Sequence, residues 1–318
     1  MKTVLYANSL WAFPALMKLQ ENKQLAGLVM PDYSSEELRS MLGFMRKAGL
    51  PYLLVKREEI KTVLPVWLKS LNAEAALVLS FPYLLPEVAF NQPHRGTFNI
   101  HFGELPRYSG AAPLFWTLKN AERYTQLTVH RVNKHFDSGA VVFQHKVPVL
   151  PGEGIGLLAN RLGVICATVL PQIFSSIKAS APGELQAQIE LLRKPSADDL
   201  CICWEKQSAE EVEALVNACN PYYGGGMTSF RGAPIRIHEV SPADTAETFF
   251  GSPGTIIHAS SQQGLFVKCS DYKIIRINVL QTPEGIFSGN KFAALGIKSS
   301  EKFVTVEPEK SVIAHETS

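Results

Sequence analysis

Three side chains between residues 99 and 139 could together perform an acyl transfer. Asn99 and His101 stand in the sequence Asn-Ile-His, and Asp137 follows in Phe-Asp-Ser-Gly. The amide could donate a hydrogen bond to an oxyanion, the imidazole could shuttle a proton, and the carboxylate could fix the charge of the imidazole. Such a set needs neither a metal ion nor a covalent intermediate.

The position of Asn99 and His101 favours a site over a structural role. They lie two residues apart at the end of an apolar run, so their side chains share one face of the expected strand. Open parallel sheets bind ligands beyond the carboxyl ends of their strands. Alone, the histidine would more often be structural, and Asp137-Ser-Gly could be a simple turn. The intervening loop, which contains Pro106 and Pro113, favours the functional interpretation.

The elements that must position these residues alternate between short apolar runs and helical patterns. This alternation predicts an α/β fold, in which a parallel sheet carries helices on both faces. Two further strands, 126–132 and 141–147, should flank the loop that carries Asp137. The other strands are expected at 3–7, 25–30, 52–56, 75–79 and 97–101, and helices at 34–48, 58–71, 112–120 and 155–178.

The pattern changes after residue 200. The capping box Ser208-Ala-Glu-Glu opens a helix that should end near Asn220. Short alternating runs follow, separated by Gly, Pro and Ser, and these predict a small antiparallel barrel. The runs span 227–230, 235–240, 254–259, 264–269 and 273–280. We therefore expect a catalytic domain at 1–180, a linker at 181–200, a barrel domain at 201–305 and a flexible tail at 306–318.

The composition is that of a globular protein with a full core and little net charge. Of 318 residues, 46% are hydrophobic and 19% are charged, and the net charge is +2. Residues 201–305 hold nine Lys and Arg against ten Asp and Glu, whereas nucleic-acid binders usually show a basic patch. No run reaches the ~18 apolar residues of a membrane span. We therefore expect a cytoplasmic protein that binds neither DNA nor a membrane.

The cysteines and the remaining histidines indicate no metal site. Cys201 and Cys203 are spaced too closely for a zinc knuckle, and no second pair follows them, so buried free thiols are expected. His130, His135 and His145 show no ligand spacing with partners. His135 is the nearest of these to the expected site and could line an acceptor pocket.

Four short motifs together resemble the formyltransferase family that uses 10-formyltetrahydrofolate. They are Asn-x-His from Asn99, Leu-Pro-x-Tyr from Leu105, Gly-x-x-Pro from Gly110 and Asp-x-Gly from Asp137. The similarity covers most of the chain, and the family includes methionyl-tRNA formyltransferases and amino-sugar N-formyltransferases. It implies a Rossmann-like, mostly parallel N-terminal domain and an OB-like C-terminal barrel.

The resemblance also implies a role for each residue in a direct attack that passes through a tetrahedral intermediate. Asn99 would bond the formyl oxygen, and His101 would shuttle a proton from the attacking amine to the leaving folate nitrogen. Asp137 would raise the pKa of His101 and order the site. The folate donor would contact two further segments, at Gly103, Glu104, Leu105, Pro106, Asn133, Lys134, His135 and Phe136.

Departures from the family pattern bear on the amine acceptor. Gly103-Glu104 stands where the family commonly has Ser-Leu, and Ser109 where an Arg usually precedes the glycine. Residues 31–48 are short and lack the basic insertion with which the tRNA enzymes grip their substrate. These features favour a small-molecule amine, such as a nucleotide-linked amino sugar, as acceptor. The alternatives are formylation of methionyl-tRNA, hydrolysis of the formyl donor, or folate binding without catalysis.

Overall fold

The computed structural model of the protein describes residues 1–33, 35–179, 191–243 and 251–306, and these residues form two compact units. The first unit comprises Met1–Pro113, Tyr124–Pro148 and Leu157–Leu192. The second comprises Leu114–Arg123, Val149–Gly156 and Arg193–Ser318. Residues 181–190 of the predicted linker and 307–318 of the predicted tail lie outside the described residues.

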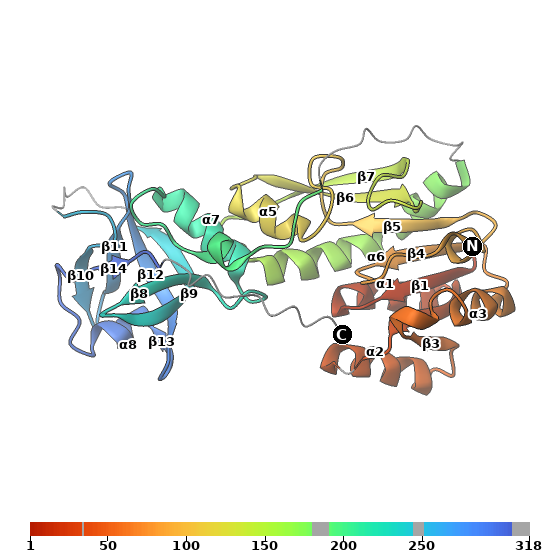
Figure 1. Cartoon of the computed structure of the whole chain (residues 1–318), viewed down its shortest axis with the longest axis horizontal. Coiled ribbons are helices and arrows are strands. Elements are labelled where there is room, and N and C mark those ends of the chain that lie inside the picture. Colours follow the sequence, from red (N-terminus) through yellow and green to blue (C-terminus); the bar gives the residue numbers. More distant parts are fainter. Residues whose placement is uncertain (34, 180–190, 244–250, 307–318) are drawn as a thin grey trace. The chain divides into compact units, whose positions relative to one another are not determined.

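The first unit is built on one seven-stranded sheet (Figure 1). Its strands are β1 (Thr3–Ala7), β2 (Leu25–Pro31), β3 (Tyr52–Val55), β4 (Ala75–Leu79), β5 (Thr97–His101), β6 (Tyr124–Arg131) and β7 (Val141–Pro148). They follow the order β3-β2-β1-β4-β5-β6-β7, in which the first five are parallel and the last two pair antiparallel. The predicted Rossmann-like, mostly parallel sheet is confirmed.

Helices cover the faces of the sheet, and the first four of them connect its parallel strands, whereas the last follows β7 (Figure 1). They are α1 (Phe13–Glu21), α2 (Glu36–Lys47), α3 (Val63–Leu71), α4 (Glu87–Phe90) and α6 (Ile155–Ala179), while most of α5 (Pro113–Lys119) belongs to the second unit. The helix predicted over 58–71 begins only at Val63, after a 3-10 turn at Arg57–Glu59. Pro65 explains the late start, because proline lacks a backbone N–H and is tolerated only in a first helical turn.

Apolar side chains fill both faces of the sheet. All five residues of β1 are buried, as expected for a central parallel strand covered on both sides. One face packs against α3 and α4 through a cluster that includes Val4, Val29, Leu64 and Phe90.

Helix α6 approaches the start of α1 closely. A Cβ at Gly163 would lie 2.4 Å from the carbonyl oxygen of Trp11, so this contact requires a glycine. By length and composition alone α6 could cross a membrane, but half of its apolar window is buried inside the protein, as in the core helix of a globular domain.

The second unit is an antiparallel, curled sheet that forms a half-barrel, consistent with the predicted small barrel domain. Its strands are β8 (Gly226–Phe230), β9 (Ala233–Ala243), β10 (Ile256–Ser260), β11 (Gly264–Lys268), β12 (Ile274–Thr282), β13 (Gly285–Ser288) and β14 (Phe303–Val304), with helices α7 (Ala209–Cys219) and α8 (Gly289–Ala293). The capping box predicted at Ser208 is present, since its hydroxyl accepts the N–H of Glu211. Trp204 anchors the core, where its Nε1 donates to Thr228 Oγ1 at 2.9 Å.

All five cysteines are free thiols. Cys166, Cys219 and Cys269 are buried, as predicted, and burial raises the pKa of each to about 12. Cys201 and Cys203 are only half-buried, which corrects the expectation that every thiol is buried.

Candidate functional site

The end of β5 carries the candidate site, because β6 returns antiparallel beside it. Asn99 and His101 share one face of β5, as their spacing predicts. The register of β6 places His130 opposite Asn99 and Thr128 opposite His101. The chain then leaves β6 and turns at Asp137, which adopts a left-handed φ of 47°. The antiparallel pair of β5 and β6, with the turn that follows β6, therefore brings the three predicted residues and an additional histidine together.

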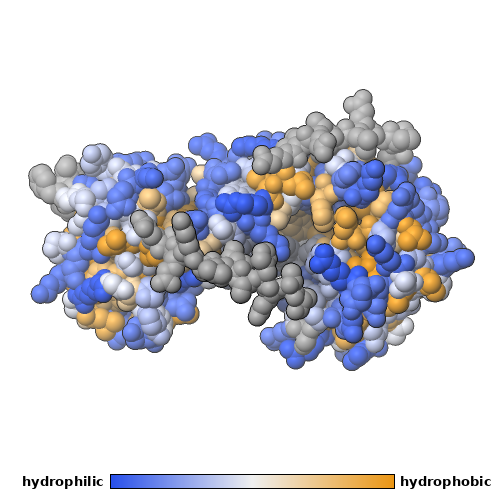
Figure 2. Space-filling view, in the orientation of Figure 1, coloured by the Kyte–Doolittle hydropathy of each residue, from blue (hydrophilic) through white to orange (hydrophobic). Residues whose placement is uncertain are grey.

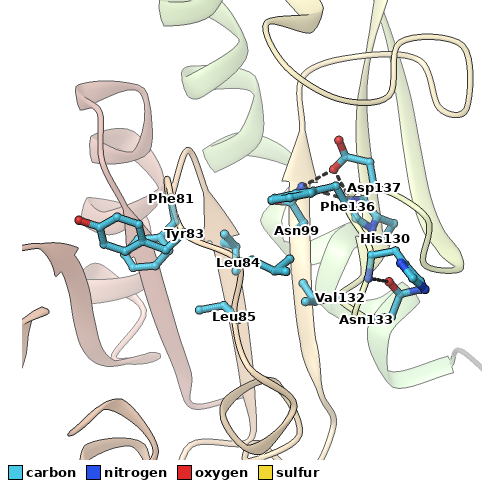
Figure 3. Close-up of a pocket in the computed structure, with 12 residues that line it drawn as sticks. Phe81, Tyr83, Leu84, Leu85, Asn99, His130, Val132, Asn133, Phe136 and Asp137 are labelled. Carbon is cyan, nitrogen blue, oxygen red and sulfur yellow. Dashed lines mark hydrogen bonds and ion pairs between the residues drawn. The ribbon is translucent and has the colours of Figure 1, made fainter. Parts of the chain in front are cut away.

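The carboxylate of Asp137 is the centre of this group (Figure 3). Its Oδ2 accepts the backbone N–H of Gly110 at 2.9 Å, and its Oδ1 accepts Nδ2 of Asn99 at 3.3 Å. Oδ1 also lies 3.3 Å from Nε2 of His130 and 3.7 Å from Nδ1 of His101. Contacts from four residues in three parts of the chain fix a single carboxylate.

These contacts keep Asp137 ionised although it is largely buried. Burial alone raises the pKa of this carboxyl. The hydrogen bond from the protonated ring of His130, the charge of the protonated His101 and the N–H of Gly110 together outweigh burial and bring the pKa to about 2. A fixed negative charge therefore faces both histidines at neutral pH.

The surroundings of His101 define which of its nitrogens can take up a proton. Nε2 lies 2.8 Å from the carbonyl oxygen of Tyr108, and since a carbonyl only accepts, the proton of the neutral ring is on Nε2. Nδ1 then faces Asp137 without a proton. A proton that arrives at Nδ1 would be stabilised by the carboxylate.

Burial opposes the predicted effect of Asp137 on the pKa of His101. Burial lowers the pKa of His101, and this outweighs the upward effects of the Asp137 charge and of the Tyr108 carbonyl. The carboxylate acts in the predicted direction, but the ring is only 7% exposed, so desolvation of the imidazolium dominates. The resting imidazole is neutral and is suited to accept a proton first.

His130 belongs to the candidate site, although its position in the sequence did not indicate this. It is 3% exposed, and its Nδ1 lies 3.1 Å from the carbonyl oxygen of Arg131, so Nδ1 carries the proton of the neutral ring. Its Nε2 then accepts from Nδ2 of Asn99 at 3.1 Å. The missing signal was the register of β6, since only pairing with β5 places His130 opposite Asn99. Ligand spacing along the sequence carries no information about that pairing.

A pocket of about 460 Å³ opens beside Asn99 and Asp137 (Figure 3). Among the residues predicted to contact folate, Asn133, His135 and Phe136 line this pocket. Asn133 also shapes the loop, because its Oδ1 accepts the N–H of His135 and the hydroxyl of Ser138.

The rest of the predicted contact set lies elsewhere. Lys134 and residues 103–106 are not among the described residues that line this pocket. Gly103 instead packs against the site from behind, since its carbonyl accepts the Thr128 hydroxyl and a Cβ there would lie 2.8 Å from His101 Nε2. Leu105 is buried. A folate contact for these residues remains a prediction.

The opposite wall of the pocket comes from the loop after β4. Phe81, Tyr83, Leu84 and Leu85 line it, and the rings of Phe81 and Tyr83 meet edge to face at 5.4 Å. Their position at the carboxyl end of the strand beside β5 could have indicated them. Figure 2 shows apolar residues gathered on the visible face of the first unit, among a mostly hydrophilic surface.

The described part of the chain offers no group of three or more His, Cys, Asp or Glu that could hold a metal ion. The site combines the amide of Asn99 and the carboxylate of Asp137, which line a largely apolar pocket, with the neutral, buried imidazole of His101. His101 itself is not among the described residues that line the pocket. Such an arrangement can stabilise an oxyanion and accept a proton, as acyl transfer to an amine requires.

Comparison with known proteins identifies relatives of both units. A family model described as formyl transferase matches residues 20–173, and one described as formyl transferase, C-terminal domain matches residues 194–293. A methionyl-tRNA formyltransferase of Dictyoglomus turgidum is 31% identical over 224 residues, 69% of each chain. One of Geotalea uraniireducens is 26% identical over 288 residues, which cover 86% of this chain and 88% of the relative.

Solved structures share the fold at low sequence identity. WlaRD, a sugar 3N-formyl transferase, has a TM-score of 0.62 at 16% identity and covers 89% of this chain and 98% of its own. HypX from Aquifex aeolicus, in complex with tetrahydrofolic acid, has a TM-score of 0.63 at 13% identity. The match covers 96% of this chain, which spans about half the length of HypX.

Proposed function

Because the chain belongs to the formyltransferase family, and is therefore a formyl-transferring enzyme, we propose that it moves a formyl group from 10-formyltetrahydrofolate to a primary amine. The acceptor in this proposal is a small molecule, such as a nucleotide-linked amino sugar. One observation carries it: Asn99 and Asp137 line the pocket, and the Asp137 carboxylate contacts Nδ2 of Asn99 and faces Nδ1 of the buried His101.

The pocket suits the flat ring system of a folate. Phe81, Tyr83 and Leu84 form an apolar wall, and Phe136 lies on the opposite side, where it is half exposed. Asn133 offers a polar edge for ring nitrogens. These residues would hold the donor, which supplies the formyl group when bound.

Asn99 would stabilise the negative charge that develops on the formyl oxygen. Its side chain lines the pocket, and one of the two hydrogen bonds that Nδ2 makes to Asp137 and His130 would be exchanged for a bond to the formyl oxygen. An oxyanion donor of this kind typically contributes about 3 kcal/mol to the transition state.

His101 would accept the proton that the attacking amine loses. The neutral ring presents Nδ1 toward Asp137, and the ion pair formed there stabilises the imidazolium until the leaving nitrogen takes the proton. Asp137 thus remains ionised throughout, as its low pKa allows.

Two features support a small acceptor. The chain from β2 leads directly into the short helix α2, whose first turn carries Glu36 and Glu37. Residues 201–305 hold nine basic against ten acidic residues, so this segment offers no net positive charge to a polyanion.

Methionyl-tRNA is the second candidate acceptor. It is favoured by the names of the curated relatives, of which the Dictyoglomus turgidum protein shares 31% of 224 aligned residues.

The decisive experiment supplies the formyl donor with each acceptor class to the purified protein. We expect formylation of an amino-sugar nucleotide from a panel, and rapid formyl-methionyl-tRNA production at physiological salt would refute the small-molecule assignment. Asn99→Ala and His101→Ala should each reduce turnover about 100-fold or more. Wild-type rates in both variants would show that these residues are structural. Donor consumption without any acceptor would instead favour hydrolysis.

A further inference from the structure

Leu192 lies outside both regions that match the formyltransferase domains, yet its main chain contacts the catalytic loop. The matched regions end at residue 173 and resume at residue 194. Leu192 and Gly110 form an isolated parallel β-bridge within the first unit. The N–H of Leu192 donates to the carbonyl oxygen of Ser109 at 2.9 Å, and the N–H of Ala111 donates to the carbonyl oxygen of Leu192 at 2.8 Å.

This bridge determines where the N–H of Gly110 points. In a parallel bridge, one residue bonds the neighbours on either side of its partner, so the partner's own N–H is directed away from it. Leu192 bonds Ser109 and Ala111, and the Gly110 N–H between them donates to Asp137 Oδ2 at 2.9 Å. The direction of this hydrogen bond is thus a consequence of the bridge.

Only glycine fits between Leu192 and Asp137. Gly110 has a φ of +100°, which side chains with a Cβ rarely adopt. A Cβ at this position would lie 2.6 Å from the carbonyl oxygen and 2.7 Å from the nitrogen of Leu192. Any larger residue would therefore separate the bridge and turn the N–H away from the carboxylate.

We propose that Leu192 is a positioning residue of the active site, whose main chain aims the Gly110 N–H at the catalytic carboxylate. The proposal rests on the proposed function for the role of Asp137. It makes the segment between the two matched domains part of the catalytic unit. Leu192 acts through Gly110 and needs no contact with either substrate.

The test replaces the amide of Leu192 in the full chain by an ester, with leucic acid, so that only the N–H is removed. The matched control is the same replacement at Leu191, outside the bridge. A lost backbone hydrogen bond of about 0.5–1.5 kcal/mol corresponds to a roughly 2- to 12-fold fall in kcat at position 192. Gly110→Ala should reduce kcat more strongly, with the donor KM little changed.

The pH profile separates positioning from a general loss of structure. Asp137 faces His101 from β5, His130 from β6 and the Gly110 N–H, and that N–H is among the contacts that lower its pKa against burial. The ester at 192 should therefore raise the pKa of Asp137 and move the acid limb of kcat/KM to higher pH. If the ester at 192 leaves both the acid limb and kcat the same as in the Leu191 control, the proposal is overturned.

A readout independent of turnover distinguishes this inference from the proposed function. In the wild-type protein the NMR resonance of the Gly110 amide should titrate with Asp137, and the ester at 192 should shift that titration upward. If the wild type transfers no formyl group, the proposed function fails, but the amide titration still decides the role of Leu192. If the titration of the Gly110 resonance is the same with and without the ester at 192, the proposed role of Leu192 is refuted.

Discussion

Replacing His130 by Leu tests whether this histidine holds Asn99 and Asp137 in their working positions. Its Nε2 lies 3.1 Å from Nδ2 of Asn99 and 3.3 Å from Oδ1 of Asp137, inside a buried site. Leucine fills similar space but can neither donate nor accept. Leaving the buried Asn99 donor without its His130 partner costs about 1–3 kcal/mol, and 1.36 kcal/mol is tenfold in rate, so kcat should fall roughly 5- to 150-fold.

The same substitution should shift the pH dependence in a defined direction. Burial raises the pKa of Asp137, and the hydrogen bond from the protonated ring of His130 is the first of the contacts that bring it down to about 2. Without that bond the pKa rises, so the protonated carboxyl persists to higher pH. The acid limb of kcat/KM should therefore move upward in His130→Leu.

Steady-state rates across the pH range, with the acceptor that supports wild-type turnover, measure both effects. His145→Leu is the matched control, because His145 is exposed on β7, the strand that pairs antiparallel with β6. His130→Gln should recover part of the rate, since its amide oxygen can accept from Asn99. A folded His130→Leu enzyme with a wild-type kcat and an unmoved acid limb would refute the reasoning.

Two further predictions concern stability. In Gly139→Ala a Cβ would lie 1.7 Å from the carbonyl oxygen of Arg131, so urea unfolding should show a loss of about 1–3 kcal/mol of unfolding free energy. Gly43 lies in open space on α2, so Gly43→Ala should gain about 0.5–1 kcal/mol. Equal stability of the two variants would contradict this account. The pKa of Asp137, about 2 against an ordinary 3.8, makes its ionised form stabilising by about 2 kcal/mol at neutral pH. Because the folded pKa is depressed, this stability is present above about pH 4 and lost as the pH falls through about 2. The difference in unfolding free energy between the wild type and Asp137→Asn should therefore shrink over that window. A constant difference would contradict the stabilising role of the ionised carboxylate.

Local patterns predicted most of the fold because burial dominates them. The strands at 3–7, 75–79 and 97–101 match β1, β4 and β5 at both ends, since apolar runs bounded by polar residues mark buried parallel strands. The error at the helix over 58–71 came from Pro65, whose effect on the helix start was underestimated. β13, β14 and α8 are short elements whose positions depend on pairing and packing partners distant in the sequence, so local patterns did not indicate them.

The candidate site was only partly predictable for a similar reason. The two-residue spacing of Asn99 and His101 on one strand is visible in the sequence. His130 and Leu192 contact the site only because of strand register and main-chain pairing, which the sequence does not show. The direction in which the pKa of His101 is shifted depends on burial, which the sequence does not show at a strand end. Side-chain chemistry was visible in the sequence, whereas three-dimensional supports were not.

The adjacency of β5 and β6 has a consequence for how the enzyme loses activity. Asn99, His101, His130 and Asp137 all come from this one antiparallel pair and the turn that follows it. Proteins open locally in contiguous cooperative units, so a single opening of the pair separates all four groups at once. The free energy of the local opening that inactivates the enzyme should therefore equal the free energy of the opening that exposes the amides of β5 and β6 to hydrogen exchange.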